Sequence, residues 1–138
     1  MPKNQIPVEE FTSPSAHRVP SHFPLSDVWH LMSSEGIRHV LVQDEAEQVV
    51  GILSQRDLTT FSQASDFSQL RAQDVMTTDL LMVTPGEPIY QVALKMSEQK
   101  VGSAVVYDPE NQEYGIFTAT DALNALVEIL RGDHDLDQ

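Results

Sequence analysis

Apolar and polar positions follow a fixed order along the first half of the chain. Apolar residues recur at helical spacing over Leu25–Met32, and two short apolar runs follow at Val40–Val42 and Val49–Leu53. The helical spacing predicts an amphipathic helix, and the two runs predict buried strands joined by an acidic turn. A short extended piece at His17–Val19 precedes the helix.

The second half of the chain shows the same order. An extended piece at Leu81–Val83 leads to a predicted helix over Ile89–Met96, and strands are predicted over Ala104–Tyr107 and Tyr114–Phe117. A closing helix is clearest in this half, because residues 122–130 place apolar side chains on one face and Gly132 supplies a helix end.

The two halves also match residue by residue. Identical residues stand 64 positions apart in several pairs, among them Val28 and Val92, Met32 and Met96, Asp44 and Asp108, and Gly51 and Gly115. Upstream of each helix the match shifts to 65 positions, which aligns Phe11-Thr12 with Met76-Thr77 and Pro20 with Pro85. The shift indicates that one residue was gained or lost near His22.

This repetition predicts two copies of one structural unit. Residues 1–66 form the first repeat with its N-terminal lead-in, residues 67–138 form the second, and the polar segment Ser62–Gln73 reads as a linker. The fold class is α+β, with two pseudo-symmetric β-α-β-β-α units. A unit of this size buries only a modest share of its surface, so we expect the two units to pack through their sheets into one module.

Composition narrows the range of functions. Among 138 residues there are 8 basic and 21 acidic side chains, for a formal net charge of −13, which disfavours nucleic acid and anionic membranes as partners. No apolar run is long enough to span a bilayer. The chain has no cysteine, which fits a reducing cytoplasm and excludes thiolate chemistry, and its histidines lack metal-ligand spacing.

Two short motifs carry the candidate chemistry. Residues 51–57 (GILSQRD) and 115–121 (GIFTATD) share the form glycine, two apolar residues, Ser or Thr, two variable residues and Asp. In a binding site, the glycine would let the backbone turn closely past a ligand, and the hydroxyl would lie near free N–H groups of a helix that favours anions. The Asp would accept hydrogen bonds from ribose hydroxyls. The same spacing from Ser54 to Asp57 and from Thr118 to Asp121 also fits a helix-capping box without any ligand.

These paired motifs resemble the signature of cystathionine-β-synthase (CBS) domains, and the resemblance covers the chain from about Val8 to Leu130. Val8–Thr12 and Asp74–Thr77 also resemble that family's lead-in segments. The resemblance implies a CBS pair, or Bateman module, with a nucleotide cleft between its two repeats. It implies ribose contacts at Asp57 and Asp121.

The resemblance also implies where phosphate and base would bind. Basic residues in nucleotide-binding family members meet the phosphates at the place of Arg38 and His39, and Arg56 adds a third cation. The corresponding residues of the second repeat carry no cation, and they are Gly102, Ser103 and Thr120. The adenine slot is implied around Val19-Pro20 and Thr84-Pro85, with the apolar residues of each signature. Alternatively, Arg38 is an ordinary surface arginine and His39 a structural histidine.

We therefore expect a regulatory sensor that binds an adenine nucleotide (AMP, ADP or ATP), with NAD and S-adenosylmethionine as alternative adenosyl ligands. The signal would pass to an unknown effector protein, and the module would be a cytoplasmic homodimer. The alternative is a dimerisation or scaffold module with empty sites. No nucleophile-and-base constellation is visible, so an enzyme is not expected.

Overall fold

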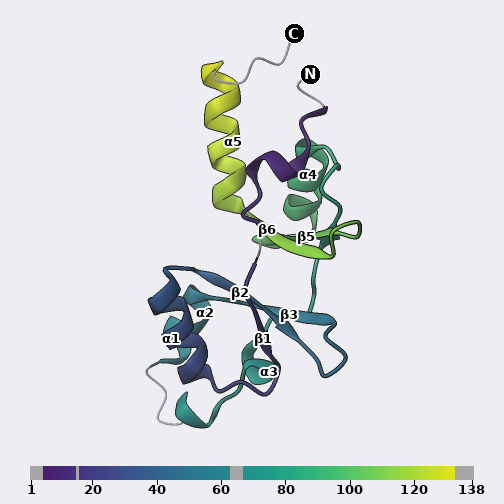
Figure 1. Ribbon diagram of the computed structural model, residues 1–138. Coiled ribbons are helices and arrows are strands. Elements are labelled where there is room, and N and C mark those ends of the chain that lie inside the picture. Colours follow the sequence, from purple (N-terminus) through teal and green to yellow (C-terminus); the bar gives the residue numbers. More distant parts are fainter. Residues whose placement is uncertain (1–4, 15, 63–66, 133–138) are drawn as a thin grey trace. The chain divides into compact units, whose positions relative to one another are not determined.

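The computed structural model describes residues 5–14, 16–62 and 67–132 of the chain (Figure 1). It divides into a continuous unit, Ala16–Leu80, and a split unit that combines Met1–Ser15 with Leu81–Gln138. Each unit holds one three-stranded sheet with its helices, so the predicted α+β class and the β-α-β-β-α order are confirmed.

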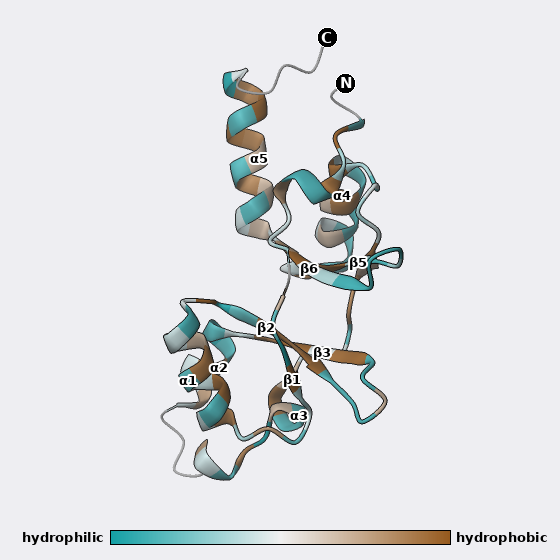
Figure 2. Cartoon of the chain, in the orientation of Figure 1, coloured by the Kyte–Doolittle hydropathy of each residue, from teal (hydrophilic) through white to brown (hydrophobic). Residues whose placement is uncertain are grey.

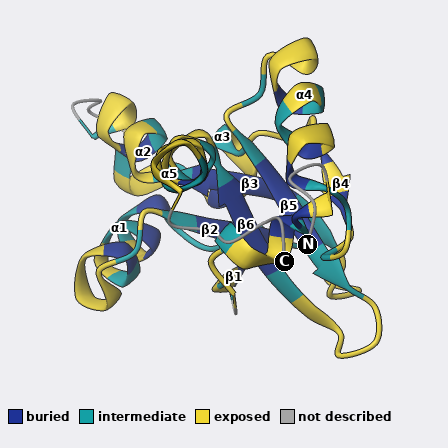
Figure 3. Cartoon of the chain, turned by 90° about the horizontal axis from the view of Figure 1, so that it is seen from above, coloured by how far each residue is buried: buried dark blue, intermediate teal, exposed yellow. Residues whose placement is uncertain are grey.

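The continuous unit is built from β1 (Arg18–Pro20), α1 (Leu25–Glu35), β2 (His39–Gln43), β3 (Val49–Ser54) and α2 (Gln55–Phe61). Its strands lie in the order β1-β2-β3, with β1 parallel and β3 antiparallel to β2. Apolar side chains of the sheet and of α1 and α2 form one buried core. The buried positions along the strands stand out in Figure 3.

The split unit repeats this arrangement. Its elements are η2 (Val8–Phe11), β4 (Met82–Val83), α4 (Ile89–Gln99), β5 (Ser103–Asp108), β6 (Glu113–Thr118) and α5 (Ala119–Arg131). The strand order is β4-β5-β6 with the same parallel and antiparallel pairing. Helix α5 is almost twice as long as α2, and it ends at Gly132 in the left-handed conformation that glycine adopts without a steric penalty.

The segment expected to be a linker is partly structured. Within Ser62–Gln73, η3 (Phe67–Gln69) and the first residues of α3 (Ala72–Val75) are ordered, and residues 63–66 lie outside the described part. Ala72 is fully buried in the core of the continuous unit. The linker prediction was wrong for residues 67–73, because a few apolar side chains in a polar stretch were enough to anchor it.

Each lead-in segment packs on the unit that contains the other repeat. Residues 6–13 pack against the split unit, where Ile6 and Val8 are fully buried in its core. Residues 70–77 pack against the continuous unit. The compact units therefore differ from the sequence boundaries 1–66 and 67–138, because burial of these apolar side chains depends on contacts distant in sequence.

Backbone hydrogen bonds fix the correspondence between the units. Ser13 bridges Ile116 as Thr77 bridges Ile52, and the Val8 N–H donates to the Glu87 carbonyl as the Ala72 N–H donates to the Phe23 carbonyl. Equivalent residues stand 64 positions apart in both cases. The predicted shift to 65 was wrong, and no residue is gained or lost near His22.

The corrected correspondence changes the match between the two slots. Val19 of β1 pairs with Val42 of β2, and Val83 of β4 pairs with Val106 of β5. Val19-Pro20 therefore corresponds to Val83-Thr84, not to Thr84-Pro85. The two prolines at 20 and 85 suggested the wrong alignment because they occupy neighbouring equivalent positions, Pro20 at the end of β1 and Pro85 one place further on, in the turn after β4.

Candidate functional site

The signature glycines do not lie where the sequence suggested. Gly51 and Gly115 are in the middle of β3 and β6, and both are buried. A β-carbon on Gly51 would collide with the Met76 side chain, and one on Gly115 would lie 2.7 Å from Thr12 Cγ2 and 2.9 Å from the Ser13 carbonyl oxygen. The prediction that glycine ends the strand beside a ligand was wrong, because a lead-in segment occupies this space.

The hydroxyl and carboxylate of each signature form a complete capping box. The Asp57 N–H donates to Ser54 Oγ at 3.1 Å, and the Ser54 N–H donates to Asp57 Oδ2 at 3.1 Å. In the second signature the Asp121 N–H donates to Thr118 Oγ1 at 3.2 Å, and the Thr118 N–H donates to Asp121 Oδ2 at 2.8 Å. The capping interpretation is confirmed. Each cap employs Oδ2, and a carboxylate has a second oxygen that accepts hydrogen bonds, so a ligand contact is compatible with the cap.

The backbone positions of the candidate phosphate ligands lie together at one end of the continuous sheet. His39 at the start of β2 pairs with Ser54 at the end of β3, and the Gln55 N–H donates to the Arg38 carbonyl at 2.7 Å. This hydrogen bond places Arg38 next to the first turn of α2, which carries Arg56. Arg38 and Arg56 are exposed and His39 is half-buried. We call Arg38, His39, Ser54, Arg56 and Asp57 the signature cluster.

The split unit has the same backbone arrangement without the charges. Ser103 pairs with Thr118, and the Ala119 N–H donates to the Gly102 carbonyl at 3.0 Å. Thr120 takes the place of Arg56. The difference in charge between the repeats therefore falls on equivalent positions of equivalent structures. Asp121 itself lines a hollow of about 390 Å³ with Phe11 and residues of α5.

The predicted adenine residues lie away from the signature cluster of their own unit. Val19 is three residues along β2 and two strands across from Ser54, which corresponds to roughly 14 Å of sheet. The second apolar residues of the signatures, Leu53 and Phe117, are fully buried in the two cores. The structure thus groups the phosphate and ribose candidates with each other, and leaves Val19 and Pro20 at the opposite edge.

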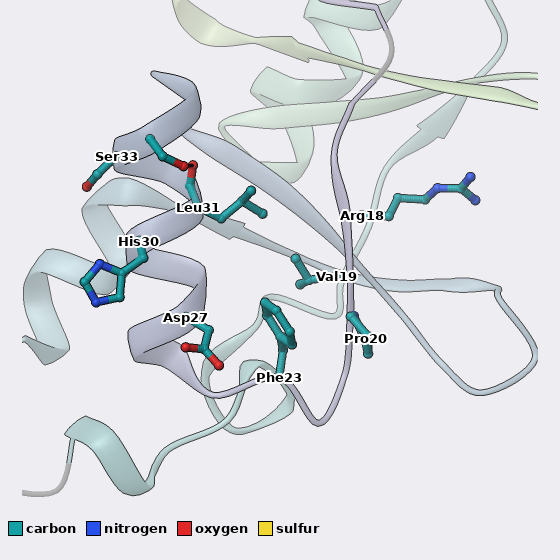
Figure 4. A pocket seen from close by; sticks show the side chains of 9 residues that line it. Arg18, Val19, Pro20, Phe23, Asp27, His30, Leu31 and Ser33 are labelled. Atoms are coloured by element: carbon teal, nitrogen blue, oxygen red, sulfur yellow. Dashed lines mark hydrogen bonds between the residues drawn. The ribbon is translucent and has the colours of Figure 1, made fainter.

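A groove lies beside β1, at this opposite edge. It has a volume of about 710 Å³ between β1 and α1 (Figure 4), and its lining residues are Arg18, Val19, Pro20, Phe23, Asp27, His30, Leu31, Ser33 and Ser34. In Figure 4 the side chains of Val19, Phe23 and Leu31 point toward one another. The sequence interpretation included Val19 and Pro20 but missed Phe23.

In the split unit, the predicted adenine residues Thr84 and Pro85 form hydrogen bonds with neighbouring residues. The Thr84 N–H donates to Glu87 Oε2 at 2.8 Å, and the Pro85 carbonyl accepts from the Glu9 N–H at 3.2 Å. Lys95 Nζ lies 3.0 Å from Glu87 Oε1. Burial opposes ionisation of Glu87, but the Thr84 N–H and the Lys95 ammonium outweigh it and lower the pKa of the carboxyl.

Apolar side chains remain exposed on α5 and α4. On α5, Leu123, Leu126, Val127 and Leu130 are 49–76% exposed and share one face of the helix. Tyr90 and Leu94 of α4 are about half exposed. Figure 2 shows these hydrophobic positions along α5. Among residues 5–14, 16–62 and 67–132, no helix is both long and apolar enough to cross a membrane.

Solved structures share this fold. A Vibrio cholerae protein named AcuB is 30% identical, with a TM-score of 0.71 over 92% of this chain and 94% of its own. CBSX2, solved in complex with AMP, is 23% identical, with a TM-score of 0.69 over 89% of this chain and 97% of its own. The CBS domain pair of MJ0100, solved with 5′-methylthioadenosine and S-adenosyl-L-methionine, is 22% identical, with a TM-score of 0.73 over 94% and 99%.

Curated relatives are much longer proteins. The chain is 30% identical over 97 residues to a homoserine O-acetyltransferase from Methanococcoides burtonii, and the match covers 70% of the chain but 19% of that enzyme. A family model for the CBS domain matches the chain twice, at residues 8–63 and 72–128. The chain therefore belongs to the CBS domain family and carries two CBS domains in tandem.

Proposed function

We propose that this CBS pair is a regulatory module that binds an adenine nucleotide and passes the signal to a partner protein. The observation that supports the proposal is the signature cluster, in which Arg38, His39 and Arg56 occupy backbone positions next to the capped Ser54–Asp57 pair. Related CBS pairs solved with AMP and with S-adenosyl-L-methionine support an adenosyl ligand.

Different residues of the signature cluster would bind different parts of the nucleotide. Arg38 and Arg56 would hold the phosphate through charge-assisted hydrogen bonds, each contributing about 1.5–3 kcal/mol. Asp57 would accept a ribose hydroxyl on the carboxylate oxygen that the cap does not employ. The ligand regulates a partner only if it binds two conformational or assembly states with different affinity.

A ligand panel tests this function. Thermal unfolding of the purified chain would be followed with AMP, ADP, ATP, NAD and S-adenosylmethionine. A ligand at about 100 times its dissociation constant stabilises the folded state by about 2.7 kcal/mol. An adenosyl compound that raises the unfolding temperature supports the sensor, and guanosine monophosphate is the control. No shift with any compound, at millimolar concentration, would remove the proposal.

A second function, a dimerisation module with empty sites, is favoured by the exposed apolar face of α5. Completed capping boxes give both signatures a role without a ligand. Four exposed aliphatic side chains on one helix face form a patch of the kind that marks a protein interface. Self-association of this face in a two-fold dimer is compatible with nucleotide binding.

A further inference from the structure

The hollow that Asp121 lines is built partly on a stretch of α5 to which α2 has no equivalent. Helix α2 ends at Phe61, and the equivalent residue of α5 is Ala125. Helix α5 continues to Arg131, and half of the residues that line the hollow lie on this extension. We call this cavity of about 390 Å³ the α5 hollow, and its lining residues are Phe11, Asp121, Asn124, Val127, Glu128 and Arg131.

Helix α5 presents three different faces. One face, which includes Ala125, packs into the core of the split unit, and a second face carries the exposed apolar side chains described above. The third face borders the lead-in segment, because Phe11 at the end of η2 lines the hollow together with side chains of α5. Residues three or four positions apart share one side of a helix, and the polar residues of the third face follow this spacing as Asp121, Asn124, Glu128 and Arg131.

One end of the α5 hollow carries two opposite charges. Half-buried Glu128 and exposed Arg131 are three residues apart, which places their β-carbons about 5–6 Å from each other. An α-amino acid carries its ammonium and its carboxylate on the same carbon atom, so it needs two opposite charges at such a short separation. A glutamate carboxylate accepts hydrogen bonds from an ammonium, and a guanidinium donates to a carboxylate through two parallel bonds. This end of the hollow therefore suits the α-ammonium and α-carboxylate of an amino acid.

The other end of the hollow carries a second carboxylate. Asp121 precedes Glu128 by seven residues, which corresponds to about 10 Å along the helix. Its Oδ2 accepts the Thr118 N–H at 2.8 Å, and its second oxygen can accept a further hydrogen bond. Phe11 and Val127 add apolar surface to the lining. A long aliphatic stem that ends in a cation fits this order of groups.

Charge and size agree with such a ligand. The hollow holds two carboxylates and one guanidinium, which leaves one net negative charge. A basic amino acid has one net positive charge at neutral pH, because its α-ammonium and α-carboxylate cancel and its side chain adds a cation. The volume of about 390 Å³ lies within the roughly 300–1,000 Å³ of small-molecule sites.

We infer that the α5 hollow binds a free amino acid with a basic side chain, such as lysine or arginine. Arg131 holds its α-carboxylate, Glu128 its α-ammonium and Asp121 the cation at the end of its side chain, while the stem lies on Phe11 and Val127. The inference goes beyond the proposed function, because it gives the split unit a ligand of a second chemical class. The signature cluster of the continuous unit shares no residue with this site.

Three ligands test the inference on the wild-type chain. Backbone amide resonances would be followed by NMR during titration with L-lysine, L-norleucine and cadaverine at matched ionic strength. Norleucine keeps the stem without the side-chain ammonium, and cadaverine keeps two ammonium groups without the carboxylate. Lysine should shift the amides of Phe11 and of residues 121–131, and it should bind at least tenfold more tightly than either analogue. Equal binding of lysine and cadaverine, or no shift with millimolar lysine, overturns the inference.

A pair of matched variants locates the site. Glu128→Gln/Arg131→Gln should weaken lysine binding at least tenfold. The control Glu98→Gln/Lys100→Gln makes the same change of charge at exposed positions of the split unit outside the hollow, and it should bind lysine like the wild type. Unchanged lysine affinity in a folded Glu128→Gln/Arg131→Gln chain also overturns the inference. Titration of the same samples with AMP tests the proposed function separately, because AMP can bind whether or not lysine does.

Discussion

Thr12 lies against Gly115, so close that a β-carbon there would be 2.7 Å from the threonine methyl group. The backbone of the next residue, Ser13, exchanges two hydrogen bonds of 3.0 Å with Ile116. A lead-in segment thus passes directly over the signature strand, and glycine at this position is a requirement of packing.

The two signature glycines should differ in their tolerance of alanine. Gly115→Ala must displace the backbone at Ser13, so we expect a loss of about 1–3 kcal/mol in unfolding free energy. Gly51→Ala meets the flexible side chain of Met76, so its cost should be smaller. Urea denaturation of both variants measures the difference. Equal losses would contradict this explanation, and Met76→Ala should relieve the cost only at Gly51.

Ile6 and Val8 should stabilise the split unit although in the sequence they belong to the lead-in of the first repeat. Both are fully buried in its core, and truncation of a buried isoleucine to alanine costs about 2–5 kcal/mol. Hydrogen exchange of Ile6→Ala should accelerate in β4–β6 and α4. Exchange in β1–β3 is the internal control and should change less. Uniform acceleration in both sheets would argue against separate cores.

Asp57 should affect nucleotide affinity more than fold stability. Asn at this position still accepts the Ser54 N–H, but it lacks the charge that a ribose contact would employ. We expect Asp57→Asn to weaken AMP binding at least tenfold, about 1.4 kcal/mol, by calorimetry. Ser54→Ala is the comparison, because it loses the cap at a cost of about 1 kcal/mol. Unchanged AMP affinity in Asp57→Asn and Asp121→Asn would leave the signature only its capping role.

The Glu87–Lys95 pair should make a small pH-dependent contribution to stability. The folded-state pKa of Glu87 is lowered, so its contribution is present above the ordinary glutamate pKa and is lost as the pH falls through the folded value. Both side chains are partly exposed, which limits the expected effect to about 0.5–1 kcal/mol. Denaturation of the wild type and Glu87→Gln between about pH 6 and pH 3 should converge at the acid end. A constant difference would contradict this assignment.

The exposed face of α5 should mediate self-association. Light scattering of the 15.4 kDa chain should give about twice that mass at micromolar concentration. Leu126→Glu or Leu130→Glu places a carboxylate on this face and should shift the mass toward the monomer. Thr60→Glu is a control on the exposed surface of α2. A monomeric wild type would show that this face does not associate with itself.

The sequence was sufficient for the strands and the longer helices of both repeats, but not for η3 and α3. Helices and strands follow from local periodicity, and Ser54 and Thr118 were placed correctly at helix starts because the cap depends on residues within one turn. Repetition alone identified two units. These are properties of short segments, which a single sequence records directly.

Features that depend on distant contacts were not predictable in the same way. Nothing local in Ile6 or Val8 indicates which sheet they cover, and the neighbouring prolines at 20 and 85 favoured an alignment that the backbone bonds exclude. Of the residues that line the groove beside β1, the sequence indicated Val19 and Pro20 and missed the others. The contrast between Phe23 and Glu87 becomes visible only when the correct offset of 64 is applied to this turn.

The exchange of lead-in segments has an evolutionary consequence. A duplicated gene segment running from one lead-in to the next closing helix would encode a repeat whose own lead-in packs on its neighbour. One copy would leave its signature strand uncovered, along with the hydrogen-bonding groups that the other copy's Ser13 or Thr77 satisfies. The smallest unit that can be duplicated or transferred intact is therefore the pair. Insertion, loss or shuffling of a single repeat would leave a sheet without the lead-in segment that covers it.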